Sequence, residues 1–215
     1  MFVNNEVVEI IIRSITISGT ATFLASLWSI PLSFLLVSRH SKTTDLIMGF
    51  FNALVGVPTV VVGLFLYIIL SRSGPLGFLG MLYTPQAIML GEAILITPLL
   101  VSLLYESFYR TREKYWELAL TLGASDRQAL KLFLLQSLPE ILVVLLLGFS
   151  RAIGELGVAL LVGGNIKGYT RVMTTAISLE VMKGEFEKAL LLGGFLITTV
   201  LGISTSIRFL KGRIE

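Results

Sequence analysis

The sequence predicts an all-helical integral membrane protein. Of its 215 residues, 54% are hydrophobic and only 14% are charged, and the mean hydropathy is +0.86. A soluble protein carries about 25% charged residues, so this chain has roughly half of the usual charged surface. Five apolar runs are long enough to cross a hydrocarbon layer as helices, which takes about 20 residues. These observations exclude a soluble enzyme, a disordered regulator and a free nucleic-acid-binding protein.

The apolar runs define the expected membrane-spanning helices. They are Ile15–Val37, Leu46–Leu70, Ala87–Tyr105, Leu132–Ser150 and Ala189–Ile207. Between the last two lies the segment 151–188, which mixes polar and apolar residues. Irregular backbone at membrane depth is tolerated only where protein buries it or where it lines a cavity. We therefore expect residues 151–188 to form a partly re-entrant, pore-side segment on the extracytoplasmic side.

The basic residues predict an N-terminus outside and a cytoplasmic C-terminus, because cytoplasmic loops retain Lys and Arg. In this orientation ten of the 17 basic residues lie on the cytoplasmic side, and the other seven lie outside or at span edges. The cytoplasmic set is Arg39, Lys42, Arg110, Arg112, Lys114, Arg127, Lys131, Arg208, Lys211 and Arg213. The bias is modest, and the acidic residues near the N-terminus and the basic tail agree with it.

Small hydroxyl residues recur along the first apolar run at spacings of three and four, which places them on one helix face. They are Ser14, Ser18, Thr22, Ser26, Ser29 and Ser33. Small side chains let neighbouring membrane helices approach closely, so we expect a packing face. A hydrophilic stripe that lines a pore is the alternative.

Residues that could support catalysis or metal binding are scarce. The chain has no Cys and a single His, His40, which leaves no thiolate nucleophile and too few ligands for a His-based metal site. It also has no HExxH or GxSxG motif. We therefore expect no catalytic residue, no metal and no cofactor, and we do not expect an enzyme.

The stretch 115–139, YWELALTLGASDRQALKLFLLQSLP, predicts two short helices joined by a hinge. Gly123 is suited to end the first helix because glycine adopts the left-handed conformation without steric cost. Ser125, with Gln128 three residues later, forms a capping-box pattern at the start of the second. A rigid, partly apolar elbow facing the cytosol suits insertion into a groove of a partner. An ordinary amphipathic connector is the alternative.

The same stretch resembles the EAA-x3-G loop of ABC importer permeases. Glu117, Ala119 and Gly123 match the motif, and Leu118 stands where the family often has Ala. Phe133 meets the apolar position ten residues after the glycine. The family's proline three positions later is replaced by Gln136, and a proline follows only at position 139. This departure concerns the start of the fourth span and leaves the elbow in place.

A second resemblance narrows the family. Residues 150–165, SRAIGELGVALLVGGN, resemble permeases for tetrahedral oxyanions, namely molybdate, sulfate and tungstate. Residues 72–85 (RSGPLGFLGMLYTP) and 163–177 (GGNIKGYTRVMTTAI) look like the tungstate-type branch. The resemblance runs from about residue 14 to residue 208.

The resemblance implies a single transmembrane permease domain over residues 1–215, in the type I ABC importer fold. Its core would cover about residues 14–208, with a cytoplasmic coupling elbow over about 110–135. It also implies a homodimer in a bacterial or archaeal cell (inner) membrane, two cytoplasmic ATPase subunits and an extracytoplasmic substrate-binding protein. The elbow would seat in the ATPase through Glu117, Ala119, Gly123, Ala124 and Ser125. Membrane lipid is a further expected partner, and nucleic acid is not.

An oxyanion path needs hydrogen-bond donors or positive potential without a site so strong that it traps the ion. Arg171 is the candidate for an electrostatic role because a guanidinium matches oxyanion geometry. The remaining candidates are Gly163, Gly164, Asn165, Thr170, Thr174 and Thr175. The resemblance adds Thr59, beside Pro58, as a residue of the second span that lines the pore, and helix packing is the alternative for it. Alternatively, Arg171 pairs with Glu155 or Glu180, or lies at the binding-protein interface.

Three further acidic residues have expected places. Arg151 and Glu155 are four residues apart, so we expect them to form a structural pair rather than a gate. Glu92 and Glu140 lie near span ends, where water is accessible.

The resemblance favours an ATP-driven importer for tungstate. The same machine carrying molybdate or sulfate is the nearest alternative. A channel or secondary transporter acting alone would leave the elbow without a purpose, and we see no inverted-repeat signal for it.

Overall fold

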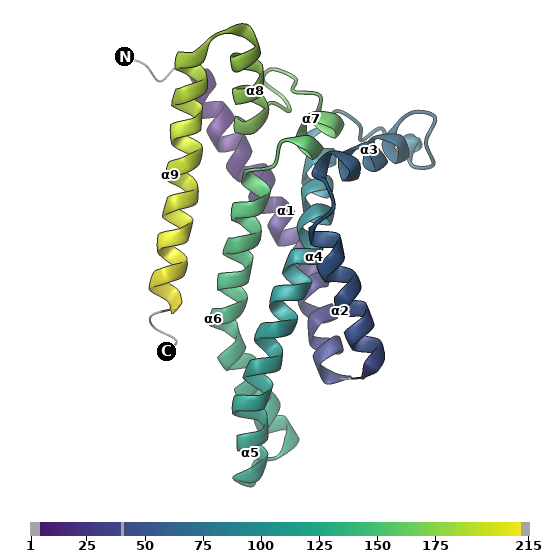
Figure 1. Ribbon diagram of the computed structural model, residues 1–215, viewed down its shortest axis with the longest axis vertical. Helices are drawn as coiled ribbons and strands as arrows, with labels where there is room; N and C mark the ends of the chain where they lie inside the picture. Colours follow the sequence, from purple (N-terminus) through teal and green to yellow (C-terminus); the bar gives the residue numbers. More distant parts are fainter. Residues whose placement is uncertain (1–4, 40, 212–215) are drawn as a thin grey trace.

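The computed structural model describes residues 5–39 and 41–211, and these residues form helices with no strand. The predicted all-α class is confirmed. His40 and Arg213 lie outside the described residues. Figure 1 shows an elongated bundle, with most of its helices aligned along the long axis.

Four long helices make up the body: α1 (Asn5–Ser38), α4 (Pro85–Thr111), α6 (Asp126–Ile153) and α9 (Phe186–Lys211). Each is long and apolar enough to cross a membrane. Each contains one predicted apolar run and extends past it, because a helix can continue where apolar residues give way to polar ones. Pro139 lies inside α6, so the fourth span starts well before the proline and the departure from the family motif does not interrupt it.

One predicted span is broken. The run Leu46–Leu70 forms two helices, α2 (Lys42–Val55) and α3 (Thr59–Leu70), which are bent by 96° relative to each other. Pro58 sits at the break; it has no N–H to donate, and it disfavours helical backbone in the residue before it. The run is therefore not one continuous helix, and the structure reaches the expected five spans if the bent pair counts as one span.

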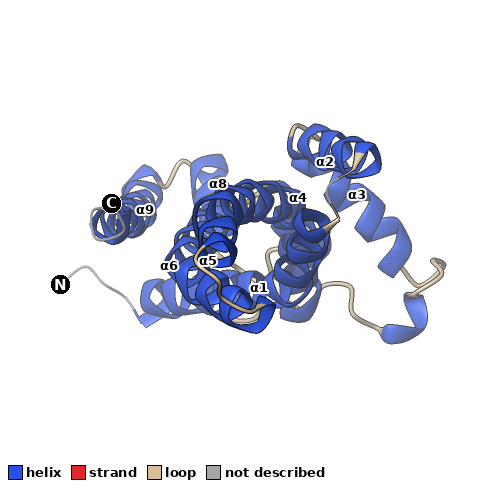
Figure 2. Cartoon of the chain, turned by 90° about the horizontal axis from the view of Figure 1, so that it is seen from below, coloured by secondary structure: helices blue, strands red, loops and turns tan. Residues whose placement is uncertain are grey.

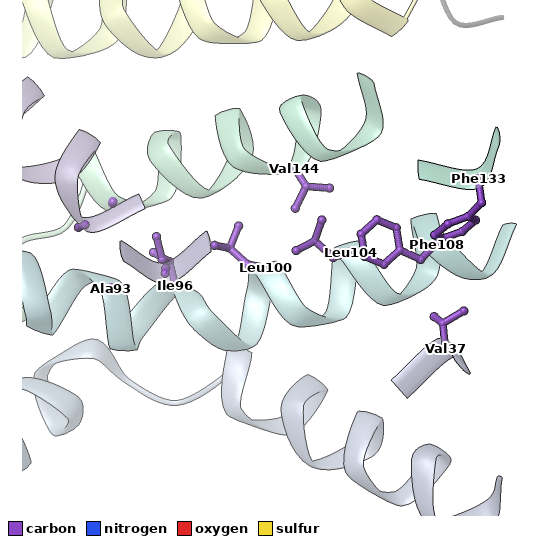
Figure 3. Packing of buried hydrophobic residues seen from close by; sticks show 11 residues of the cluster. Val37, Ala93, Ile96, Leu100, Leu104, Phe108, Phe133 and Val144 are labelled. Atoms are coloured by element: carbon purple, nitrogen blue, oxygen red, sulfur yellow. The ribbon is translucent and has the colours of Figure 1, made fainter. Parts of the chain in front are cut away.

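The core follows α4, which packs against α1, α6, α2 and α7 (Gly157–Gly163). Figure 3 shows apolar side chains of α4 in a row that meets Val144 and Phe133 of α6 and Val37 of α1. Seen along the long axis, α9 lies on one side of these central helices, and α2 and α3 lie on the other (Figure 2).

The hydroxyl stripe of α1 is a packing face. All six of its predicted residues are at most 7% exposed, and α1 packs along α4. Ser33 donates to the carbonyl of Val101 on α4 (3.2 Å), and Ser14 accepts a hydrogen bond from the N–H of Met173 (2.8 Å). Because these hydroxyls serve helix contacts, the packing interpretation is confirmed over the pore stripe.

Glu92 is buried within this packing. It lies on α4, is 2% exposed, and has Ser18 of α1 as a hydrogen-bonding neighbour. The expectation that water reaches Glu92 is wrong, because the close approach of α1 and α4 covers it. Glu140 is partly exposed and borders a cavity of about 160 Å³ between α4 and α6.

The two ends of the bundle carry different structures (Figure 1). The short helix α5 (Glu117–Thr121) lies at one extreme. The start of α1, α3, α7 and α8 (Met173–Lys183) lie at the other end. The elbow and the pore-side segment are therefore separated along the long axis. Which end faces the cytoplasm stays a prediction from the basic residues.

Candidate functional site

The first half of the elbow is α5, which ends at a left-handed glycine. Gly123 has φ of +85°, and its N–H donates to the carbonyl of Leu120 (3.0 Å). The N–H of Ala124 donates to the carbonyl of Ala119 (3.0 Å). This pair of bonds is a Schellman motif, which satisfies carbonyls at a helix end and requires a residue that tolerates positive φ. The prediction that Gly123 ends the first helix is confirmed.

The second half of the elbow begins with the predicted capping box. Ser125 is the N-cap of α6, and its N–H donates to Oε1 of Gln128 (2.9 Å). Such a reciprocal cap satisfies N–H groups that have no partner within the helix. Because local hydrogen bonds hold both sides of the turn, the angle between α5 and α6 is set within about ten residues of chain.

The elbow presents leucines outward. The exposed fractions are 54% for Leu118, 39% for Leu120 and 79% for Leu122, whereas Ala119 is buried at 7%. Glu117 is also exposed. Exposed apolar side chains gathered beside polar ones are typical of a protein interaction site. This arrangement favours a site where a partner docks over a plain connector, because a connector would be more stable with its leucines buried.

An aromatic cluster joins the elbow to the long helices, and sequence analysis missed it. Phe133 of α6 lies 6.5 Å from the ring of Trp116, 5.8 Å from Phe108 and 5.9 Å from Phe34, measured between ring centroids. Trp116 ends a π-helical turn, η2 (Arg112–Trp116), between α4 and α5. The sequence identifies Phe133 only as a position of the family motif. Its contacts with aromatic rings of α1, α4 and η2 cannot be predicted from the sequence, because these rings lie far apart along the chain.

At the opposite end, the connection from α7 to α8 starts with two residues in the left-handed region. Gly164 has φ of +70° and Asn165 has φ of +52°. The hydroxyl of Thr170 donates to the carbonyl of Gly163 (2.6 Å) and accepts from the N–H of Ile166 (2.9 Å). Thr170 is fully buried, so it holds the turn instead of offering a free donor.

Arg171 lies at the end of this turn and is 12% exposed. Its Nε donates to Oδ1 of Asn165 (3.2 Å), and its Nη1 lies 3.5 Å from Oε1 of Glu6 on α1. Its acidic partner is therefore Glu6; Glu155 and Glu180 pair with other basic residues. The suggested pairing of Arg171 with either of those two is wrong, because only the folding of α1 against this turn brings Glu6 close.

The other predicted path residues are also engaged within the chain. The hydroxyl of Thr174 donates to the carbonyl of Glu155 (2.7 Å), and that of Thr175 accepts from the N–H of Val172 (3.1 Å) at the start of α8. Thr59, at the start of α3, faces Gly157: a Cβ at that glycine would lie 2.9 Å from the Thr59 hydroxyl. The structure thus gathers residues 163–175 in one region and places Thr59 against the start of α7.

Arg151 and Glu155 form the predicted ion pair, with Nη1 and Oε2 2.8 Å apart. Glu155 is 2% exposed and also accepts a hydrogen bond from the N–H of Val158 (3.2 Å) near the start of α7. The carboxylate therefore links the end of α6 to the first turn of α7. This geometry confirms that the two residues form the predicted ion pair.

Comparison with known proteins agrees with this architecture. The sequence profile of the family described as "Binding-protein-dependent transport system inner membrane component" matches residues 21–211. The match covers most of the chain and includes the elbow and the turn that holds Arg171.

Three relatives illustrate the similarity. The tungstate uptake system permease protein TupB of Peptoclostridium acidaminophilum is 37% identical over 96% of this chain and 90% of its own length. TupB of Campylobacter jejuni is 39% identical over 65% of this chain and 59% of its own. The molybdenum transport system permease protein ModB of Haemophilus influenzae is 30% identical over 77% and 78%. With its apolar helices, the chain is a multi-pass protein of a prokaryotic inner membrane. It belongs to the binding-protein-dependent transport system inner membrane components, the permease subunits of ABC importers.

Proposed function

We propose that this chain is the permease subunit of a tungstate importer, driven by ATP hydrolysis in a separate subunit. The observation that carries the proposal is the 37% identity to a tungstate uptake permease along 96% of the chain. The chain itself contributes no chemistry to the cycle; its task is to alternate between two conformations and pass the ion.

The elbow is the proposed seat of the ATPase. Glu117, Ala119, Gly123, Ala124 and Ser125 form it, and the exposed side chains of Leu118, Leu120 and Leu122 supply apolar contact area. A helix-in-groove contact uses such a rigid apolar element. Two copies of the permease, each with one elbow, would engage two ATPase subunits. The whole chain, residues 1–215, acts in this proposal as one permease domain.

The opposite end is the proposed receiving side, where a substrate-binding protein delivers the ion. The proposed path residues are Thr59, Gly163, Gly164, Asn165, Arg171, Thr174 and Thr175. Because the hydroxyls of Thr174 and Thr175 already bond within the chain, the positive charge of Arg171 is the main attraction for a dianion. A path with one partly screened charge suits transport, since it attracts an anion without trapping it.

Molybdate or sulfate is the alternative cargo, supported by the similarity to ModB at 30% identity and to the sulfate permease CysT of Salmonella typhimurium at 24%. The higher identity to the tungstate permease favours tungstate.

Uptake by a reconstituted complex tests the proposal. Proteoliposomes would carry the permease, its ATPase and internal ATP, with the binding protein and tungstate outside; internal tungsten would be counted by mass spectrometry. We expect ATP-dependent uptake that excess molybdate inhibits weakly and excess sulfate less still. Uptake without ATP would overturn the importer assignment, and faster uptake of molybdate or sulfate than of tungstate would overturn the cargo.

A further inference from the structure

A compact group of charges joins the first turns of α1 to the turn between α7 and α8. Lys167 and Arg171 come from that turn. Glu6, Glu9 and Arg13 come from α1. They line a cavity of about 160 Å³ at the end of the molecule opposite the elbow. Three positive and two negative side chains leave this cavity with a formal charge of +1.

The two arginines of the cavity are fixed in place. Arg13 is 17% exposed and donates to the carbonyls of Arg171 (3.0 Å) and Gly168 (2.9 Å). Arg171 is 12% exposed and is held by the side chain of Asn165. A guanidinium held by neutral acceptors keeps its charge available, so these contacts preorganise positive potential without neutralising it.

Glu6 is held much more weakly. Its two oxygens face two different cations, with Oε2 3.3 Å from Nζ of Lys167 and Oε1 3.5 Å from Nη1 of Arg171. The Glu6 side chain is 42% exposed and that of Lys167 is 69% exposed. A contact between two exposed charges, such as Glu6 and Lys167, contributes about 0.2–1 kcal/mol, so water and ions compete with it effectively. The contact of Glu6 with Arg171 is long for an ion pair, at 3.5 Å.

We propose that this cavity, named here the Glu6 pocket and lined by Glu6, Glu9, Arg13, Lys167 and Arg171, is a landing site for a tetrahedral oxyanion. The Glu6 carboxylate occupies the anion's place until the anion arrives. A dianion satisfies Lys167 and Arg171 with twice the charge of Glu6, and exchange leaves Glu6 free to turn toward solvent.

The inference rests on the proposed function for the identity of the ion, and it adds a site and a mechanism of exchange. The position of the pocket agrees with it, because Arg171 both lines the pocket and belongs to the proposed path. The phosphate of a lipid headgroup has the same tetrahedral chemistry, so the test must separate the two sources.

Direct binding to the purified permease–ATPase complex, without binding protein, tests the pocket. Sodium tungstate is the probe, measured by equilibrium dialysis at constant ionic strength. Replacing Glu6 by Gln should tighten binding by about fivefold, equivalent to ~1 kcal/mol, because it removes a competitor that makes two weak ion pairs. Replacing Lys167 by Gln should weaken binding severalfold.

Glu9 supplies the matched control, since it lines the same cavity and lies 4.0 Å from Arg13. Glu9→Gln changes the net charge by the same amount and frees neither Lys167 nor Arg171. It releases only Arg13, whose guanidinium stays bonded to the carbonyls of Gly168 and Arg171, so we expect less than about a twofold effect. An equal gain from both variants would mean that general charge, not exchange with Glu6, controls binding. If Glu6→Gln binds tungstate no more tightly than the wild type, Glu6 only holds the two segments together and the proposal is overturned. The proposal is also overturned if neither the wild type nor the variant binds tungstate up to millimolar concentration.

Two further experiments separate a lipid phosphate from the transported ion, and the Glu6 pocket from the proposed function. If phosphatidylglycerol nanodiscs abolish the tungstate binding seen in detergent, the pocket belongs to a lipid headgroup and its assignment to the transported ion is overturned. ATP-dependent uptake with binding protein is measured in parallel. Intact tungstate uptake with no binding at the Glu6 pocket refutes only the pocket, whereas no uptake of any oxyanion refutes the proposed function.

Discussion

Replacing Gly123 by Val should uncouple ATP hydrolysis from transport. Gly123 has φ of +85° and closes the Schellman motif between α5 and α6. A Cβ at this position would meet nothing within 4 Å, so the effect is conformational and not a steric clash. Left-handed backbone costs an ordinary residue about 1–2 kcal/mol, and a β-branched one is an outlier there.

A penalty of this size changes the population of the native elbow by roughly 5- to 30-fold relative to alternatives. The assay is the proteoliposome system described above, with tungstate imported per ATP hydrolysed as the measured ratio. We expect this ratio to fall, by at most about the same factor. The melting temperature of the complex should hardly change, because Gly123 is exposed and lies two residues after α5, which stands at one extreme of the molecule (Figure 1).

Asn is the control substitution, because it tolerates the left-handed region. Gly123→Asn should retain most of the coupling. If the Val variant couples as well as the wild type, the angle of the elbow is irrelevant to transport. If Asn loses as much as Val, any side chain at this position disturbs the partner surface, and the conformational reasoning is refuted.

Three other outcomes are expected. Gly91→Val should lower the free energy of unfolding by about 1–3 kcal/mol, because a Cβ there would lie 2.5 Å from Cγ1 of Val158 and would overpack the α4–α7 contact. Thermal unfolding in detergent measures this, with Gly193→Val as the control, since a Cβ at that glycine of α9 would meet nothing within 4 Å. Glu155→Leu should lower the free energy of unfolding by about 1–3 kcal/mol, since it leaves the buried N–H of Val158 without an acceptor and Arg151 without its ion-pair partner. A melting temperature equal to that of the wild type would show that Glu155 does not stabilise the junction of α6 and α7. Arg171→Gln should slow uptake by roughly tenfold, the value of one lost charge-assisted hydrogen bond, while co-purification of the ATPase stays intact; wild-type uptake would leave Arg171 a structural residue only.

The parts of the site that sequence reasoning predicted are those set by neighbours in the chain. The glycine at the end of α5 and the capping box of Ser125 and Gln128 each depend on residues within five positions. The ion pair of Arg151 and Glu155 spans one helical turn. Such features follow from local hydrogen bonding and helix periodicity, so a pattern is enough to find them.

The parts it missed depend on distant contacts. Hydropathy measures how apolar a run is but not the direction in which its backbone goes. It therefore predicts one span over residues 46–70, although the two helices on either side of Pro58 are bent by 96° relative to each other. The alternative for Arg171 names acidic partners nearby in the sequence, whereas its partner on α1 is 165 residues away. The burial of Glu92 depends on how closely α1 and α4 approach, which composition does not encode.

By itself, the sequence determined that this is a helical membrane protein with a rigid elbow, because apolar length, helix period and capping chemistry act over a few residues. Only the tertiary structure decided which charges meet. It brought Glu6, Lys167 and Arg171 together at one end and seated Trp116 against Phe133 near the other. The physical reason is that ion pairs and ring contacts act over a few ångströms in space, and chain separation alone does not say which residues come that close.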